Sequence, residues 1–269
     1  MPVIARTRVI ATAVLLTLAV GALWAAVSSG QRTYTLPDLR QVVPGEVGLK
    51  VVNGRDRLVF SSTIVNVGNG PFVVVGHRPS TRRSYMTGDQ VLFDAAGHST
   101  KILNIGQLLY IRAPDHAHWH LQKLEIYELR DAATGKIVAP DRKTGFCPGD
   151  RYVVQSGMPR GWNRRLGQLR NDLYCGKKQT KALTVLESIS PGWADVYKPN
   201  LEGQYIDVTG VPAGEYVLVN RVNSRMRMRE AGYDNNASSA LIRINRPAGG
   251  PPSVEKLDSC QDSAVCPKP

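Results

Sequence analysis

The sequence has little of what a helical protein or a thiol redox protein needs. Few stretches show the 3.6-residue spacing of an amphipathic helix, and residues 181–189 suggest at most one short helix. Cysteine occurs four times, never in the C-x-x-C spacing of a thiol redox motif. No basic helix, stacking-aromatic motif or known nucleic-acid-binding module is present, which argues against nucleic acid as a partner.

Acidic residues are also in short supply. The 34 Lys and Arg exceed the 22 Asp and Glu, and the formal net charge is +12 at pH 7. A surface with such an excess favours anionic surroundings, so an anionic cell-surface polymer is a candidate partner. Hydrophobic residues make up 42% of the 269 residues, enough to bury the core of one or two domains.

Charged residues are absent from Val9 to Val27, directly after Arg6 and Arg8. This run is just long enough to span a bilayer, and the small residues "AAVSSG" at its end suit signal cleavage. The sequence therefore predicts that residues 1–30 are a signal peptide or a membrane anchor. Either would place the rest of the chain outside the cytoplasm, secreted or membrane-anchored, so this segment is excluded from the fold argument.

The four cysteines suit an exported protein, in which structural disulfides persist. Four cysteines allow three pairings, and the sequence does not choose among them. Proximity along the chain favours Cys147 with Cys175 and Cys260 with Cys266.

From Leu49 onward, short β-branched runs alternate with Gly, Pro and Asn. Residues 58–76 indicate two strands joined at a Gly-Asn-Gly-Pro turn. Further expected strands are "LEIYEL" (124–129), "KIVA" (136–139), "QYIDVT" (204–209), "GEYVLVNRVN" (214–223) and "SSALIRIN" (238–245). The pattern predicts an all-β fold: an antiparallel β-sandwich with an Ig-like core and irregular loops, formed by residues 31–246. Residues 247–269 are expected to be an irregular Pro/Gly-rich tail with a disulfide loop.

The scarce histidines are concentrated, with three of the five in "DHAHWHL" (115–121). Alternate residues of a strand project from one face, so His116, His118 and His120 would share a face, whereas a helix would scatter them. The outer two lie roughly 13 Å apart along an extended strand, a distance that imidazole arms and metal–nitrogen bonds of ~2 Å can close, with help from a bend. Three imidazoles suit Zn(II) or Cu(II), and the spacing alone does not decide between them.

"HAHWH" resembles the copper-binding HxHxH motif of the lysyl oxidase family, and other segments resemble that family in the same order. "LPDL" (36–39) matches the start of its catalytic domain, and "KTGFC" (143–147) matches a lysine four residues before a cysteine. Residues 190–218 match the long segment with its essential tyrosine, and "YDNN" (233–236) also fits. The resemblance covers about residues 36–246.

This resemblance implies a copper ion held by the three histidines and a self-made cofactor, lysine tyrosylquinone (LTQ). Aligned on the motifs, LTQ would form from Lys143 and Tyr197. The route requires a phenol that can become a quinone and a primary amine that can add to the ring, so Phe at 197 or Arg at 143 would abolish it. Asp195 is a candidate for orienting the ring or acting as the base.

The implied activity is that of a protein-lysine 6-oxidase-like copper amine oxidase. It would use molecular oxygen to convert primary amines to aldehydes, with release of hydrogen peroxide and ammonia. The expected substrate is the ε-amino group of lysine in a protein or peptide, and small primary amines remain open.

Two other classes of function compete with the oxidase. "LPDL" and "SSTIVNVGNGPF" (61–72) also look like the opening of Ig-like cell-surface adhesion modules, which predicts a non-catalytic, metal-carrying binding module with Lys143 far from Tyr197. A histidine–metal hydrolase or oxygenase using zinc or iron would instead leave these two side chains unlinked and keep a metal position open for water.

Overall fold

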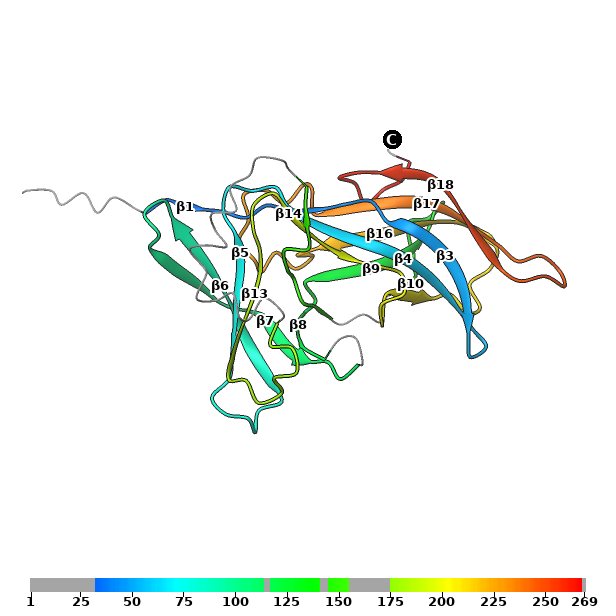
Figure 1. Ribbon diagram of the computed structural model, residues 1–269. Helices are drawn as coiled ribbons and strands as arrows, with labels where there is room; N and C mark the ends of the chain where they lie inside the picture. The colour runs from blue at the N-terminus through cyan, green and yellow to red at the C-terminus, as the bar shows by residue number, and fades with distance from the viewer. Residues whose placement is uncertain (1–31, 114–116, 141–144, 155–174, 268–269) are drawn as a thin grey trace, which may run out of the picture. The chain divides into compact units, whose positions relative to one another are not determined.

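The computed structural model describes residues 32–113, 117–140, 145–154 and 175–267 (Figure 1). Within these ranges the regular secondary structure is entirely β-strand, and every strand pairing is antiparallel. The prediction of an all-β antiparallel fold is confirmed. These strands belong to one compact unit, Thr33–Pro269.

Within the described ranges, no helix has the length and apolar character needed to cross a membrane. The apolar run predicted to be a signal or anchor lies outside them.

The strands form three sheets. The first has the order β11-β8-β7-β6-β5-β13, with β1 on β6. The second has the order β12-β14-β4-β15, with β2 and β3 on β4, and the third is β10-β9-β16-β17-β18.

The strand bounds of the first sheet are β1 Tyr34–Thr35, β5 Phe72–His77, β6 Tyr85–Asp94, β7 Ser99–Tyr110, β8 Trp119–Gln122, β11 Gly145–Phe146 and β13 Thr184–Ile189. Those of the second sheet are β2 Leu39–Gln41, β3 Gly45–Val52, β4 Arg55–Asn66, β12 Tyr152–Val153, β14 Trp193–Tyr197 and β15 Tyr205–Asp207. Those of the third are β9 Glu125–Asp131, β10 Ile137–Pro140, β16 Gly214–Val222, β17 Ala237–Asn245 and β18 Ser253–Cys260.

The second and third sheets pack together as a β-sandwich. Phe60 of β4 and Tyr127 of β9 meet edge to face with their ring centroids 4.8 Å apart. Ile206 of β15 and Leu218 of β16 belong to the same fully buried cluster. Figure 1 shows β5 and β6 away from this sandwich, with β8 in the region between. The Ig-like character of the core stays a prediction.

All five expected strands between residues 124 and 245 are present, as β9, β10, β15, β16 and β17. The two strands expected in residues 58–76 are also present, as β4 and β5, but they do not pair with each other. The chain crosses between sheets at the Gly-Asn-Gly-Pro segment. A turn signal marks a change of direction and does not specify the partner of the next strand.

Two local predictions are wrong. Residues 181–189 contain β13 and no helix. Nearly every residue of β13 is buried, so both faces are covered and the alternation of apolar and polar residues typical of a half-exposed strand is absent. The tail contains β18, an edge strand that pairs with β17, where an irregular linker was expected. Its charged residues and the preceding Pro and Gly obscured it, as is common for edge strands.

Both disulfides that chain proximity favoured are present. Cys147 bonds to Cys175, and Cys260 bonds to Cys266.

Candidate functional site

The histidine segment is only partly a strand. His120 lies in β8, whereas His118 lies at a bend just before it, and His116 lies outside the described residues. Both described imidazoles are buried, with ring centroids 4.7 Å apart. Alternate residues of an extended strand are ~6.6 Å apart, so the two rings lean toward each other.

Two imidazoles that bind one metal ion through nitrogens at ~2 Å must have centroids within about 6 Å of each other. The 4.7 Å separation of the His118 and His120 rings satisfies this condition. Neutral imidazole nitrogen is a donor that suits copper and zinc. The described pair therefore fits a copper or zinc ion.

Trp119 anchors this segment from the face opposite the histidines. Its indole is fully buried, its backbone N–H donates to the Cys175 carbonyl at 2.9 Å, and its Nε1 donates to the Gln179 carbonyl at 3.1 Å. The Arg78 guanidinium lies 4.6 Å from the ring centroid. Because these contacts fix the backbone at position 119, they also fix the histidines on either side of it.

Strand β11 brings the segment after Lys143 against the histidine strand. Gly145 and Phe146 pair with β8. A Cβ on Gly145 would lie 3.0 Å from the Cβ of His120 and 2.9 Å from the Leu121 carbonyl oxygen, so the approach requires glycine. Lys143 itself lies outside the described residues.

Tyr197 ends β14 with its side chain buried beside the same segment. Its hydroxyl accepts a hydrogen bond of 2.7 Å from the Cys147 N–H and lies 3.3 Å from the Cys147 carbonyl oxygen. The Phe146 ring packs edge to face against it at 4.5 Å between centroids. Burial, reinforced by the Asp195 carboxylate, raises the pKa of the Tyr197 phenol well above 10, so the phenol is protonated at neutral pH.

Asp195 lies two residues before Tyr197 on β14 and therefore on the same face of that strand. It is buried and accepts a hydrogen bond of 3.2 Å from the Gly149 N–H. The Arg151 Nε lies 3.6 Å from its other oxygen. The structure thus places a buried carboxylate, held by a cation and a backbone amide, beside the candidate cofactor tyrosine.

Glu187 of β13 is a further acidic residue here that the sequence analysis missed. Its side chain is only 1% exposed. Burial raises the pKa of Glu187 well above 4.5, and Asp195 raises it further, whereas the Leu121 N–H of β8 lowers it. Its signal in the sequence was one carboxylate within the otherwise uncharged run "TVLESI". The sequence analysis also did not identify Arg151 and Phe146 as residues of the candidate site.

Sequence comparison identifies the same stretch of the chain. The profile of the family described as lysyl oxidase matches residues 107–247, more than half of the 269 residues. This range contains the histidines, β11, β13 and β14, whereas the "LPDL" segment at 36–39 lies outside it.

The chain is similar to lysyl oxidase homolog 1 of Homo sapiens, with 32% identity over 131 residues, which is 48% of this chain and 19% of that protein. It is also similar to protein-lysine 6-oxidase of Sus scrofa, with 30% identity over 129 residues, which is 48% of this chain and 44% of that protein. For protein-lysine 6-oxidase of Gallus gallus the identity is 31% over 129 residues, which is 48% of this chain and 26% of that protein. The matched region therefore spans less than half the length of each of these relatives. The resemblance in the motifs is confirmed, and the chain belongs to the lysyl oxidase family.

Proposed function

We propose that this protein is a copper- and quinone-dependent amine oxidase acting on primary amines, with peptidyl-lysine ε-amino groups as the main substrate class. In the overall reaction, a primary amine, dioxygen and water yield an aldehyde, ammonia and hydrogen peroxide. The carbon that carries the amine loses two electrons, and dioxygen gains them. Family membership supports an amine oxidase of the lysyl oxidase type.

The observation that carries this proposal is the position of β11 between the histidine strand and Tyr197. Gly145 pairs with Gln122 of β8, close enough to His120 that an added Cβ would lie 3.0 Å from the His120 Cβ, and two residues later the Cys147 N–H binds the Tyr197 hydroxyl. Lys143 is only two residues before Gly145, and two residues of chain span at most about 7 Å. A covalent link between Lys143 and Tyr197 is therefore within reach of the chain.

His116, His118 and His120 would hold the copper, and Lys143 and Tyr197 would form LTQ. When bound, these groups would supply an electron-accepting ring and electron transfer to dioxygen. The chain's own residues position the ring: Cys147 holds the Tyr197 hydroxyl, and Phe146 packs on its edge. Asp195, on the same strand face, would take the proton from the substrate's α-carbon.

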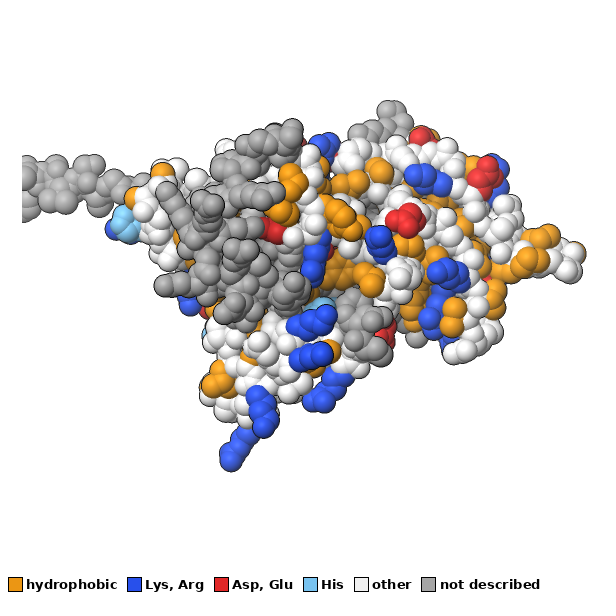
Figure 2. All heavy atoms as spheres, in the orientation of Figure 1, with side chains coloured by type: hydrophobic (Ala, Val, Ile, Leu, Met, Phe, Trp, Pro, Cys, Tyr) orange, Lys and Arg blue, Asp and Glu red, His pale blue; other side chains and the backbone are white. Residues whose placement is uncertain are grey.

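We also propose that the protein acts outside the cytoplasm. Its two disulfides persist in oxidising compartments, and the uncharged run near the N-terminus suits export. On the face shown in Figure 2, Lys and Arg side chains are more widespread than Asp and Glu, which favours anionic polymers as neighbours.

The test is hydrogen peroxide release from copper-loaded protein, measured with a lysine-containing peptide and with a small primary amine. Tyr197→Phe and Lys143→Arg should both reduce the rate to background. Tyr152→Phe is the matched control, since Tyr152 is exposed on β12, and it should keep the wild-type rate. Thermal unfolding of each variant reports whether the fold survives. Activity in folded Lys143→Arg would exclude LTQ, and no peroxide from the wild type would favour the non-catalytic binding module.

A further inference from the structure

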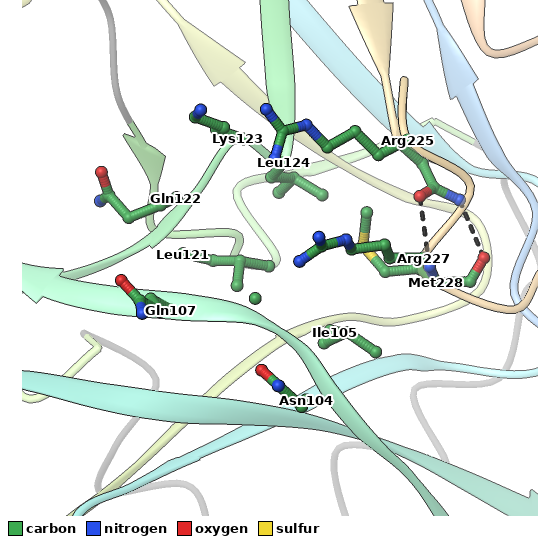
Figure 3. Close-up of a pocket in the computed structure, with 12 residues that line it drawn as sticks. Asn104, Ile105, Gln107, Leu121, Gln122, Lys123, Leu124, Arg225, Arg227 and Met228 are labelled. Atoms are coloured by element: carbon green, nitrogen blue, oxygen red, sulfur yellow. Dashed lines mark hydrogen bonds between the residues drawn. The ribbon is translucent and has the colours of Figure 1, made fainter.

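A cavity of about 330 Å³ opens where β7, the turn between β8 and β9, and the loop after β16 meet (Figure 3). Three exposed cations line it, Lys123 from the turn and Arg225 and Arg227 from the loop, and no acidic residue does. Within the described ranges, none of these cations forms an ion pair. Uncompensated positive charge around a concave site attracts anions.

The remaining lining is amide and apolar. Asn104, Gln107 and Gln122 contribute side-chain amides, while Leu121 and Met228 contribute apolar surface. Figure 3 shows the Arg227 side chain extending across the cavity toward Leu121. Amides both donate and accept hydrogen bonds, which matches a peptide backbone better than phosphate or sulfate, whose oxygens mainly accept. The apolar surface suits the methylene groups of a long acidic side chain.

Left-handed backbone is concentrated here. Asn104, Lys123 and Asn223 line the cavity with φ of 55°, 59° and 45°, and Met226, between the two arginines, has φ 49°. Side chains other than glycine rarely adopt this conformation, and such strain gathers at functional sites. At position 123 a lysine stands where glycine would be relaxed.

Hydrogen bonds of Asn223 join the ends of the loop that carries Arg225 and Arg227. The Asn223 side chain accepts a hydrogen bond of 3.2 Å from the Met228 N–H and donates one of 2.9 Å to the Met228 carbonyl. The Asn223 N–H donates to the Leu124 carbonyl at 2.7 Å. Arg225 and Arg227 are therefore displayed by a loop with fixed ends, which lowers the entropic cost of binding.

Two strongly exposed apolar residues are chain neighbours of residues that line the cavity. Leu103, next to Asn104, is 71% exposed, and Met226 is 68% exposed. Within the described ranges, these are the highest exposed fractions among large hydrophobic residues.

We propose that this cavity binds an acidic peptide segment, with its carboxylates on Lys123, Arg225 and Arg227 and its backbone on the amides. A peptide bound there would lie beside β8, since Leu121 and Gln122 of that strand line the cavity. The inference does not depend on the proposed oxidase activity.

The experiment measures fluorescence anisotropy of an oligoglutamate peptide carrying a neutral dye, titrated with the full-length protein in the absence of copper and amine substrate. Binding should saturate and weaken with added salt. Lys123→Gly and Arg227→Gln should each weaken it about tenfold, the loss of one charge-assisted contact. Lys123→Gly should also fold at least as stably as the wild type, since glycine relieves the positive φ.

Lys178→Gly is the matched control, because Lys178 is an exposed lysine with φ 60° outside the cavity lining. It should bind the peptide as the wild type does. Absence of saturable binding, or equal binding by the Lys123 and Arg227 variants, would overturn the proposal. Binding to phosphatidylserine vesicles but not to the peptide, lost in the same variants, would also overturn it and assign the surface to a membrane.

Discussion

The disulfides Cys147–Cys175 and Cys260–Cys266 lie in surroundings of different kinds. The first joins residues 28 apart, and its backbone touches two parts of the candidate site: the Cys147 N–H binds Tyr197, and the Cys175 carbonyl accepts from Trp119. The second joins residues 6 apart at the end of β18. The first positions the candidate site, whereas the second closes a loop on an edge strand already paired by a ladder.

Loop size gives the same order of importance. The chain-entropy estimate is about 4 kcal/mol for a loop of the first size and about 2 kcal/mol for the second. β11, which carries the candidate lysine's segment, has only two residues and cannot be held by ladder hydrogen bonds alone. The site region therefore depends on long-range covalent and side-chain contacts, whereas the sandwich depends on extended strand pairing.

The largest effect should come from removing each disulfide in turn. Cys147→Ser with Cys175→Ser should abolish amine oxidation and lower the unfolding temperature, because Tyr197 and the histidine strand lose their common anchor. Cys260→Ser with Cys266→Ser should keep most of the activity. Peroxide release and calorimetry on both double variants make the comparison, and equal activity losses would contradict it.

A smaller but still large effect is expected at the glycine that lets β11 approach β8. Gly145→Ala forces a Cβ against His120 and Leu121, so activity should fall at least about tenfold, as for a site displaced by about an ångström. Gly48→Ala on β3 is the control, since its Cβ would meet only Val59 at an ordinary 3.5 Å. Copper content measured alongside the rate would show whether the metal ligands have moved. Similar rates in the two variants would mean that β11 is not tightly placed.

The smallest effect concerns a buried carboxyl away from the site. Burial raises the pKa of Glu230 to about 7, although hydrogen bonds from Asn223, Leu39 and Asn236 lower it. The pKa of Glu230 in the folded protein exceeds its unfolded value of 4.5, so the folded state favours the protonated carboxyl. Its contribution to the free energy of unfolding is therefore complete below pH 4.5 and is lost as the pH rises through 7. The loss should approach about 3 kcal/mol.

Denaturant unfolding between pH 4.5 and pH 8 measures the free energy of unfolding and therefore this loss. Glu230→Gln should remove the part of the slope of that free energy against pH that Glu230 causes. Glu187→Gln should act in the same direction, because burial also raises the pKa of Glu187. Unlike Glu230→Gln, it should also change amine oxidation, since Glu187 lies near Asp195. If neither variant changes the slope, the two carboxyls are not buried as described.

Much of the sandwich could be predicted from the sequence, since β9, β15, β16 and β17 have alternating or β-branched runs bounded by turn residues. The sequence could not predict which strands pair with each other, because pairing depends on contacts between residues far apart in the chain. β13 was mistaken for a helix because both of its faces are buried, and β18 was missed because an edge strand tolerates charge.

For the candidate site, the motifs named the histidines, Lys143, Tyr197 and Asp195, and the structure brings His118, His120, Tyr197 and Asp195 into one region around β11. It does not describe His116 or Lys143, and the roles of all these residues stay predictions. Glu187 was not foreseen, because an acidic residue in a short apolar run carries no motif. Its position beside Asp195 follows only from how β13 and β14 pack.

The central claim is that Lys143 and Tyr197 become one cofactor beside the copper-binding histidines. A peptide mass map of protein loaded with copper in the presence of oxygen tests it most directly. We predict a covalently linked pair of peptides, one containing Lys143 and the other Tyr197, which is absent when copper is withheld. Recovery of both peptides unlinked from copper-loaded, oxygenated protein would contradict the claim.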